Sequence, residues 1–146
     1  MTVYSKHQDK RVKEIKNKYV FGLYSGITQR TPVDTGRARG NWTVAKDNPD
    51  LSVDEDSTNV KYEDYKDMPK STGDEPMFIA NALPYICTLE FGGYPDPVKR
   101  GSRDKKTGQY VIKSENGFSK QAPEGMVGVT IANSKNILDG VIKTTL

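Results

Sequence analysis

Cysteine, histidine and long apolar runs are the features that this sequence has least of. The 146 residues include one cysteine, Cys87, and one histidine, His7. A single cysteine excludes an internal disulfide, and the two residues together are too few for a multi-cysteine zinc site. Cys87 stands in an apolar stretch, so we expect a buried thiol in a short helix, whereas the polar surroundings of His7 predict an exposed side chain.

The shortage of histidine also removes the common catalytic arrangements. A Ser-His-Asp triad or an activated cysteine needs a histidine next to the nucleophile, and only His7 is available. The sequence contains no Gly-x-x-x-x-Gly-Lys-Ser/Thr loop for phosphate binding. We therefore expect a protein that is not an enzyme and that uses no cofactor and no metal.

Apolar residues are scarce and scattered. They make up 34% of the chain, against about 45–50% in typical domains when glycine is counted too, and the mean hydropathy is −0.72. No run approaches the ~20 apolar residues of a membrane helix, and the charged first twenty residues do not resemble a signal peptide. We expect a soluble protein, made in the cytoplasm, that either carries long polar loops or completes its burial against partners.

Charge of one sign is not in large excess either. Twenty-two basic and nineteen acidic residues give a net charge of +3, which is far from the dense positive surface of a dedicated nucleic-acid binder. Charge alone therefore identifies no partner.

The periodic segments predict one domain over residues 1–146, beginning with an amphipathic helix over about 5–30. Its apolar positions recur every three or four residues: Val12, Ile15, Tyr19, Leu23 and Ile27. Gly22 and Gly26 lie near this stripe, and because glycine costs about 1 kcal/mol against alanine inside a helix, we expect a neighbouring segment to approach closely there.

Residues 31–120 are predicted to form a small sheet with long loops. Residues 41–46 alternate as in a half-buried strand, with Trp42 as the core anchor, and residues 76–83 read as a central strand. The acidic stretch 51–65 predicts an exposed loop with room for one edge strand.

The second half of the chain predicts two more helices. Residues 85–91 suit a short helix that ends at Gly92, and residues 109–113 suit a strand or hairpin arm after a basic loop. Pro123 is placed for the first position of a helix over about 123–142. The predicted fold class is α+β: a small antiparallel sheet packed by a long N-terminal helix and a C-terminal helix, with long loops.

Residues 31–42 join the first helix to the first strand, and they include Asp34-Thr35-Gly36, the tripeptide of aspartic proteases. In those enzymes two such aspartates share one proton. Here Pro32 precedes the tripeptide instead of an apolar strand, and Arg37 opposes a shared-proton state. A structural turn is favoured, and a dimeric aspartic protease remains a remote alternative.

A basic loop at 99–106 supports a different hypothesis about function, a DNA-binding module, because mobile cations bind phosphates without regard to base sequence. The candidate DNA contacts, inside a channel or elsewhere, are Lys99, Arg100, Arg103, Lys105 and Lys106. Asp96 and Asp104 dilute this cluster, so a solvated loop is the simpler interpretation. The acidic region 54–67 could alternatively meet this loop on a neighbouring copy.

Three stretches taken together resemble one family. Residues 31–42 (Thr-Pro-Val-Asp-Thr-Gly-Arg-Ala-Arg-Gly-Asn-Trp), residues 81–94 (Asn-Ala-Leu-Pro-Tyr, then Leu-Glu-Phe-Gly-Gly-Tyr) and residues 121–127 (Gln-Ala-Pro-Glu-Gly-Met-Val) are similar in order and spacing to the tail-completion or neck proteins of long-tailed bacteriophages, related to the minor tail protein Z of lambda.

The resemblance implies a structural protein of the virion, made in the bacterial cytoplasm, that joins the head connector to the tail. It implies a homo-oligomer, usually a six-fold ring around the DNA channel, with the head-connector or stopper protein and the tail terminator as partners. No membrane and no small-molecule substrate are implied, and contact with DNA in the channel would be non-specific.

Residue roles follow from the physical properties of the matched positions. Asp34 is expected to cap the turn, with Gly36 in it, while Arg37 and Arg39 make corner or intersubunit ion pairs and Trp42 packs in the core. The candidate interface residues are Tyr85, Glu90, Phe91 and Tyr94.

Overall fold

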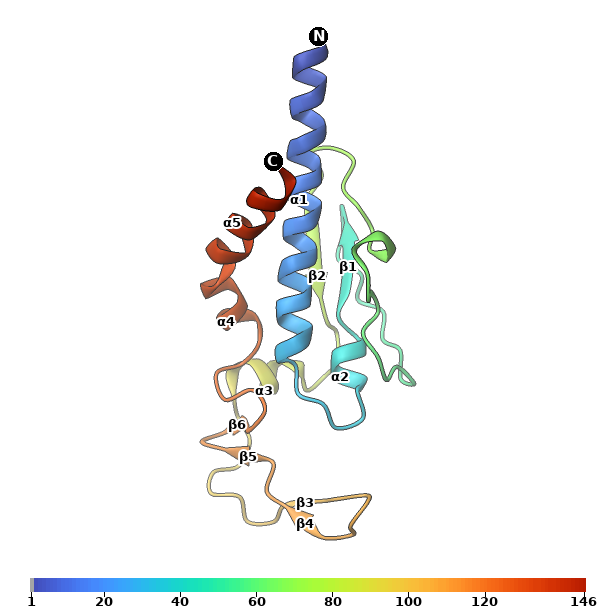
Figure 1. Cartoon of the computed structure of the whole chain (residues 1–146). Coiled ribbons are helices and arrows are strands. Elements are labelled where there is room, and N and C mark those ends of the chain that lie inside the picture. The colour runs from blue at the N-terminus through green and yellow to red at the C-terminus, as the bar shows by residue number, and fades with distance from the viewer. Residues whose placement is uncertain (1) are drawn as a thin grey trace.

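The computed structural model describes residues 2–146 and has the predicted α+β architecture (Figure 1). A long helix, α1 (Val3–Arg30), packs against a C-terminal pair, α4 (Val127–Ala132) and α5 (Ser134–Thr145). On the other side of α1 lies an antiparallel pair of strands, β1 (Thr43–Lys46) and β2 (Met77–Ala80), with Thr43 opposite Ala80. No helix among the described residues is long and apolar enough to span a bilayer.

The predicted N-terminal helix is present, but its buried side is not the predicted stripe. The residues that it buries are Asn17, Val20, Tyr24, Gly26, Ile27 and Thr28. Val12 is 65% exposed and only Ile27 of the predicted set is buried. The predicted stripe was wrong because α1 lies between two layers, the sheet on one side and α4 with α5 on the other. Its apolar residues are therefore divided between two neighbours and do not form one buried face.

Asn17 is the polar member of this buried face. Its side-chain amide donates to the carbonyl of Ser71 (3.0 Å) and accepts the Ser71 N–H (2.7 Å), so both polar groups of that loop residue are satisfied. The preceding residue, Lys16, donates from Nζ to Ser71 Oγ at 2.9 Å. Along α1 these are the first side-chain hydrogen bonds to another segment of the described chain.

The close approach predicted at two glycines of α1 is confirmed. A Cβ added to Gly22 would lie 2.5 Å from Cγ2 of Ile137 in α5, and one added to Gly26 would lie 2.9 Å from Cγ2 of Thr130 in α4. Any side chain at these positions would push the C-terminal helices away from α1.

The sheet is smaller than predicted. β2 pairs with β1 alone within residues 2–146, and all four of its residues are half-buried, so the prediction of a central strand was wrong. The edge strand allowed in 51–65 is absent there as well. The segment between β1 and β2 is instead a long loop with one 3-10 turn, η1 (Tyr65–Asp67), held by bonds such as those from the N–H groups of Lys61 and Tyr62 to the Tyr24 hydroxyl.

A short helix, α3 (Ile86–Phe91), ends at Gly92 as predicted, and Gly92 has a positive φ of 81°. Cys87 is exposed, which contradicts the predicted buried thiol. The helix buries Leu89, and residues two apart point to nearly opposite sides of a helix, so Cys87 faces outward.

The C-terminal helix begins later than predicted and is divided in two. Gly125 has a φ of 79°, which is not helical, so α4 starts at Val127 and Pro123 lies outside it. The division comes at Asn133, whose N–H is shared between the carbonyls of Val129 and Thr130.

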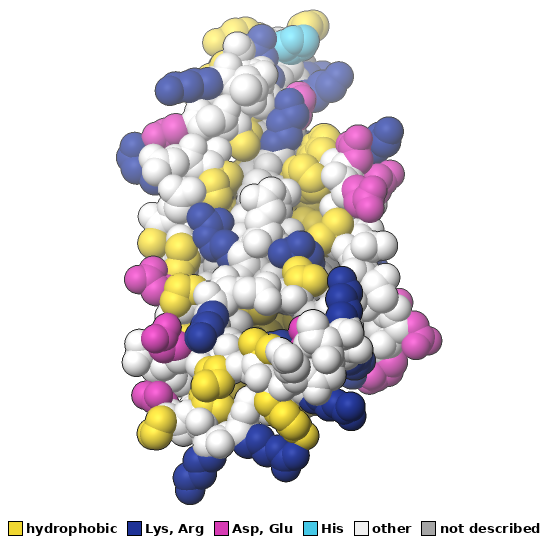
Figure 2. All heavy atoms as spheres, turned by 60° about the horizontal axis from the view of Figure 1, so that its bottom comes forward, with side chains coloured by type: hydrophobic (Ala, Val, Ile, Leu, Met, Phe, Trp, Pro, Cys, Tyr) yellow, Lys and Arg dark blue, Asp and Glu magenta, His cyan; other side chains and the backbone are white. Residues whose placement is uncertain are grey.

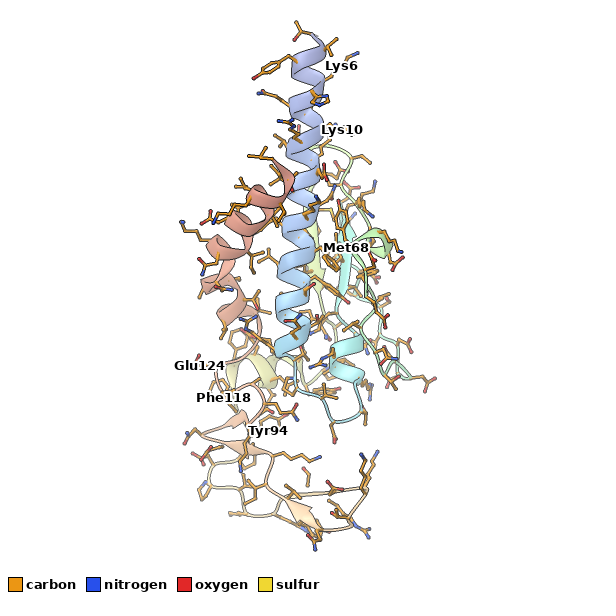
Figure 3. All side chains as sticks on the ribbon, viewed as in Figure 1. Lys6, Lys10, Met68, Tyr94, Phe118 and Glu124 are labelled. Carbon is orange, nitrogen blue, oxygen red and sulfur yellow. The ribbon has the colours of Figure 1, made fainter. Side chains whose placement is uncertain are left out.

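Two small hairpins form a lobe, residues 95–120, at the end of the molecule opposite the N-terminus (Figures 1 and 3). One hairpin pairs β3 (Ser102–Arg103) with β4 (Tyr110–Val111), and the other pairs β5 (Ser114–Glu115) with β6 (Phe118–Ser119). The predicted strand in 109–113 is thus reduced to two residues.

Candidate functional site

The corner, residues 31–42, is fixed by a chain of buried hydrogen bonds. The Thr31 hydroxyl donates to the Ile27 carbonyl (2.8 Å) and accepts the indole N–H of Trp42 (2.9 Å). Thr31 and Trp42 are 1% and 5% exposed. The end of α1 and the start of β1 are therefore tied together through one side chain, and Trp42 is in the core as predicted.

Gly36 makes the turn within the corner. Its φ is 89°, and an added Cβ would collide with the carbonyl of Thr58, so only glycine fits. It precedes a single turn of helix, α2 (Arg37–Gly40), whose first N–H is accepted by the Thr35 hydroxyl at 3.3 Å. The N-cap residue is Gly36, and the Asp34 side chain accepts no N–H of this turn, so the prediction that Asp34 caps it was wrong.

Asp34 instead reaches across to the lobe. Its carboxylate accepts a hydrogen bond from Lys113 Nζ at 2.8 Å, and its side chain is 74% exposed. This bond raises the pKa of Lys113. Beside it, the Gln121 amide donates to the Val33 carbonyl (3.0 Å) and accepts the Val33 N–H (2.8 Å). These contacts attach the lobe to the corner.

The two corner arginines have different roles. Arg37 forms an ion pair with Glu55, as predicted for a corner contact. Arg39 forms no ion pair with any described residue and donates instead to the carbonyls of Thr31 (3.1 Å) and Gln29 (3.4 Å), while the alternative of an intersubunit ion pair stays a prediction. Arg39 therefore closes the end of α1 by satisfying carbonyls that the helix leaves open.

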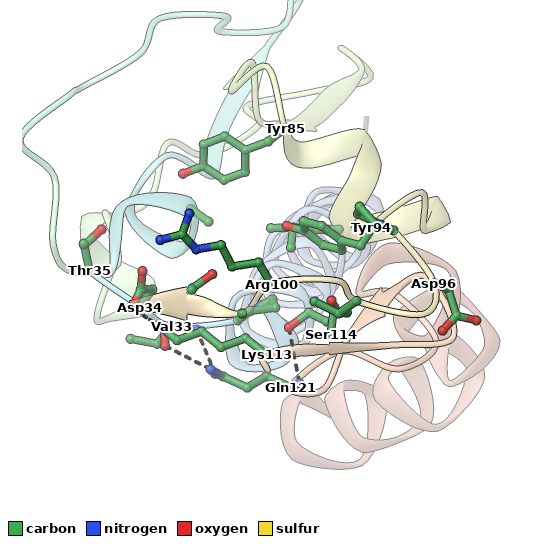
Figure 4. A pocket seen from close by; sticks show the side chains of 18 of the residues that line it. Val33, Asp34, Thr35, Tyr85, Tyr94, Asp96, Arg100, Lys113, Ser114 and Gln121 are labelled. Carbon is green, nitrogen blue, oxygen red and sulfur yellow. Dashed lines mark hydrogen bonds and ion pairs between the residues drawn. The ribbon is translucent and has the colours of Figure 1, made fainter. Parts of the chain in front are cut away.

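A cavity of about 870 Å³ separates the corner from the lobe (Figure 4). Tyr85 and Tyr94 line it together with cations and anions of both segments: Asp34, Arg37, Asp96, Lys99, Arg100 and Lys113. In Figure 4 the Arg100 side chain extends toward the region between Tyr85 and Asp34. The walls of the cavity come from segments far apart in sequence, so the cavity exists only while the lobe is attached to the corner.

The four candidate interface residues do not share one role. Burial raises the pKa of Tyr85, and it also raises the pKa of Tyr94; both side chains border the cavity. Phe91 is 77% exposed and makes no part of the core. Glu90 is hydrogen-bonded within this chain's own fold, and its place at or near an interface stays a prediction.

Glu90 closes the N-terminus of α4. Its carboxylate accepts the N–H groups of Met126 (2.7 Å), Val127 (2.8 Å) and Gly128 (2.8 Å). Burial raises the pKa of Glu90, but hydrogen bonds from these three N–H groups outweigh it, so the pKa lies below its ordinary value. A carboxylate in this position stabilises the positive end of the helix.

The basic loop forms the outer hairpin, and its cations are exposed (Figure 2). Arg100 stacks over the ring of Tyr110 at 4.7 Å and donates to its hydroxyl at 2.6 Å. The Asp104 carboxylate accepts the N–H groups of Thr107 and Lys106, which lowers its pKa and shapes the turn. Lys99, Arg103, Lys105 and Lys106 lie on the same lobe, free to meet an anionic surface.

One charged segment was missed because it resembles ordinary helix surface. Residues 2–13, the arm, project beyond the rest of the molecule (Figure 1). They carry four cations, among them Lys6 and Lys10 (Figure 3), and His7 is exposed there as predicted. The run of charges was visible in the sequence, but nothing there indicated where the tertiary contacts of α1 begin.

The arrangement offers little for chemistry. Cys87 and His7 lie on α3 and on the arm, toward opposite ends of α1. Within residues 2–146 no three His, Cys, Asp or Glu side chains are grouped to hold a metal ion. What the site does offer is exposed charge, exposed aromatic surface and a cavity between two attached segments.

Comparisons with protein-family models, with curated proteins and with solved structures found no match. The function proposed below rests on the sequence motifs and on the geometry just described.

Proposed function

We propose that this protein is a structural subunit of a bacteriophage neck, a tail-completion protein that joins the head connector to the tail. It would act as a ring of identical subunits, usually six, around the DNA channel of the virion. In this proposal the protein is not an enzyme, and its partners are its own copies, the head connector or stopper protein, and the tail terminator.

One observation supports this proposal most: the small core carries two projections, the arm and the lobe, and each makes few contacts with the core. The arm leaves one end, and the lobe leaves the other, where it is held by the bond between Lys113 and Asp34 and by the N–H groups of Gly93 and Tyr94, which donate to the Gly117 carbonyl. Large apolar side chains are exposed on both projections, among them Tyr4 (74%) and Ile112 (49%). A subunit of a closed ring can cover such surfaces with its neighbours.

DNA contact by the lobe is the second candidate function. Its support is the exposure of Lys99, Lys105 and Lys106 on one hairpin. The two candidates are compatible, since a lobe facing the channel of a ring would meet phosphates without reading bases.

The geometry gives no support to the aspartic protease alternative. Asp34 is exposed, is held by Lys113 and follows a loop, whereas a shared-proton pair needs two carboxylates facing each other in a protected site.

Imaging of phage particles tests the proposal directly. We expect antibody or tagged-subunit density at the junction of head and tail, and tails that fail to join heads when the gene is disrupted. Particles that join heads to tails normally without this protein would rule the proposal out. Retention of DNA at high salt, or after Lys105→Glu with Lys106→Glu, would rule out the second candidate.

A further inference from the structure

The arm is a helix with no partner in its own chain. Every side-chain hydrogen bond of residues 2–13 stays within that segment, as between Gln8 and Tyr4 (3.0 Å), and none of its cations forms an ion pair with a described residue. Val3, Tyr4 and Val12 are 84%, 74% and 65% exposed.

A free helix of this kind is poorly stabilised. Its first turn has no acidic residue and carries Lys6, so charge opposes the helix dipole, and its apolar side chains Val3, Tyr4 and Val12 are exposed and add no packing. Side chains that cover Tyr4 and Val12 and neutralise the cations would stabilise it.

The loop over residues 51–56, the acidic loop, has the complementary surface. Asp54 and Asp56 are exposed and form no ion pair with a described residue, while Leu51 and Val53 are 62% and 38% exposed. It thus combines anions with aliphatic side chains, as the arm combines cations with apolar ones.

The arm cannot reach the acidic loop of its own chain. Asn41 of the corner holds that loop by exchanging hydrogen bonds with the Asp54 backbone (2.7 and 2.9 Å), beside the C-terminal end of α1. The arm is the other end of the same 28-residue helix, about 25–40 Å from Arg30 at 1.5 Å per residue.

We infer that the arm of one copy docks on the acidic loop of the next copy. The contact joins opposite ends of the molecule, so it is heterologous and closes into a ring when the rotation between copies allows. The inference rests on the proposed function, because it names a contact by which the ring would assemble.

A complementary charge exchange tests the contact. The arm variant is Lys6→Glu, Lys10→Glu and Lys13→Glu, and the loop variant is Asp54→Asn, which retains the side-chain acceptor for the Asp56 N–H, with Asp56→Lys. The arm variant places carboxylates against the acidic loop, and the loop variant removes the net negative charge of residues 54–56, so we expect self-association of each variant alone to be at least tenfold weaker than wild type. Mixed one to one, each arm meets a loop of opposite charge, and association should return as alternating assemblies.

Sedimentation velocity and native mass spectrometry in low salt provide the readout, with circular dichroism to verify folding. The matched control reverses three exposed lysines elsewhere, Lys120→Glu, Lys135→Glu and Lys143→Glu, and should associate like wild type.

Three outcomes would overturn the docking contact: a wild-type chain that remains monomeric, an arm variant that associates normally, or a mixture that does not recover. Loss of binding to a 40-base-pair DNA with unchanged self-association would assign the arm to nucleic acid instead. The particle imaging described above tests the neck function separately, so a failed contact with correct neck density refutes only the contact.

Discussion

At the scale of single residues, Glu90 connects two segments that are distant in sequence. It lies in α3, and the three N–H groups that it accepts belong to residues 36 to 38 positions later. This single carboxylate accepts the first N–H groups at the start of α4, so a substitution there should act on stability.

We predict that Glu90→Gln lowers the free energy of unfolding by about 1–2 kcal/mol at pH 7, the usual value of hydrogen bonds to a charged group. Because the folded pKa is below the ordinary 4.5, the carboxylate's contribution is complete above pH 4.5 and is lost as the pH falls through the folded pKa. The difference between variant and wild type should therefore shrink in acid. Urea unfolding at several pH values measures it.

Glu124→Gln is the matched control, since Glu124 is exposed and its side chain accepts no hydrogen bond from a described residue (Figure 3). It should change stability by less than about 0.5 kcal/mol. An equal effect of the two substitutions, or a Glu90 effect independent of pH, would contradict the role assigned to Glu90.

At the scale of elements, glycine decides how closely α1 and α5 pack. Gly22 in α1 meets Ile137, whereas Gly140 in α5 has nothing within 4 Å of an added Cβ. The same substitution at the two positions should therefore have opposite effects.

We predict that Gly22→Ala destabilises the protein by about 1–2 kcal/mol, because overpacking costs more than the roughly 1 kcal/mol gained in helix propensity. Gly140→Ala should stabilise it by about 0.5–1 kcal/mol. Thermal and urea unfolding provide the measurement. Removing the obstructing methyl with Ile137→Ala should cost less in the Gly22→Ala background than in wild type, and strict additivity would contradict the packing explanation.

Elements marked by local signals were predictable from the sequence. The long helix, its two close-packed glycines and the end of α3 at Gly92 depend on residues within a few positions of one another. The buried stripe of α1 was not predictable in this way, because burial of Asn17 depends on Ser71, 54 residues later.

The residues of the candidate site also divide into those that were predictable from local sequence and those that depend on distant partners. Trp42 and the turn at Gly36 were recognisable from local sequence, whereas the roles of Asp34 and Glu90 depend on partners 79 and at least 36 residues away. The cavity was likewise beyond prediction, since it is bounded by the corner and by a lobe whose attachment no local pattern encodes.

At the scale of the whole molecule, the lobe is peripheral to the fold. The core runs from α1 through the corner and the sheet to α3 and the start of α4, and most of residues 95–120 are exposed. Weakly attached hairpins with exposed backbone open more readily than a packed core.

We predict that trypsin cleaves the folded protein within 99–106 well before it cleaves at Arg37 or Arg39. The two products should stay together on size-exclusion chromatography, because α4 and α5 remain packed on α1. Mass spectrometry of a time course identifies the cuts. Early cleavage in the corner, or separation of the products without denaturant, would show that the lobe is integral to the fold.

The continuity of α1 has a mechanical consequence. One uninterrupted helix begins with the arm and ends at Arg30, directly before the corner, and it is held near its middle by the hydrogen bonds of Lys16 and Asn17 to Ser71. A sideways force on the arm would therefore tilt α1 about the contact with Ser71. Thr31 follows the other end of this helix, and its hydroxyl accepts the indole N–H of Trp42, so a force on the arm would also act on the hydrogen bond that holds the corner.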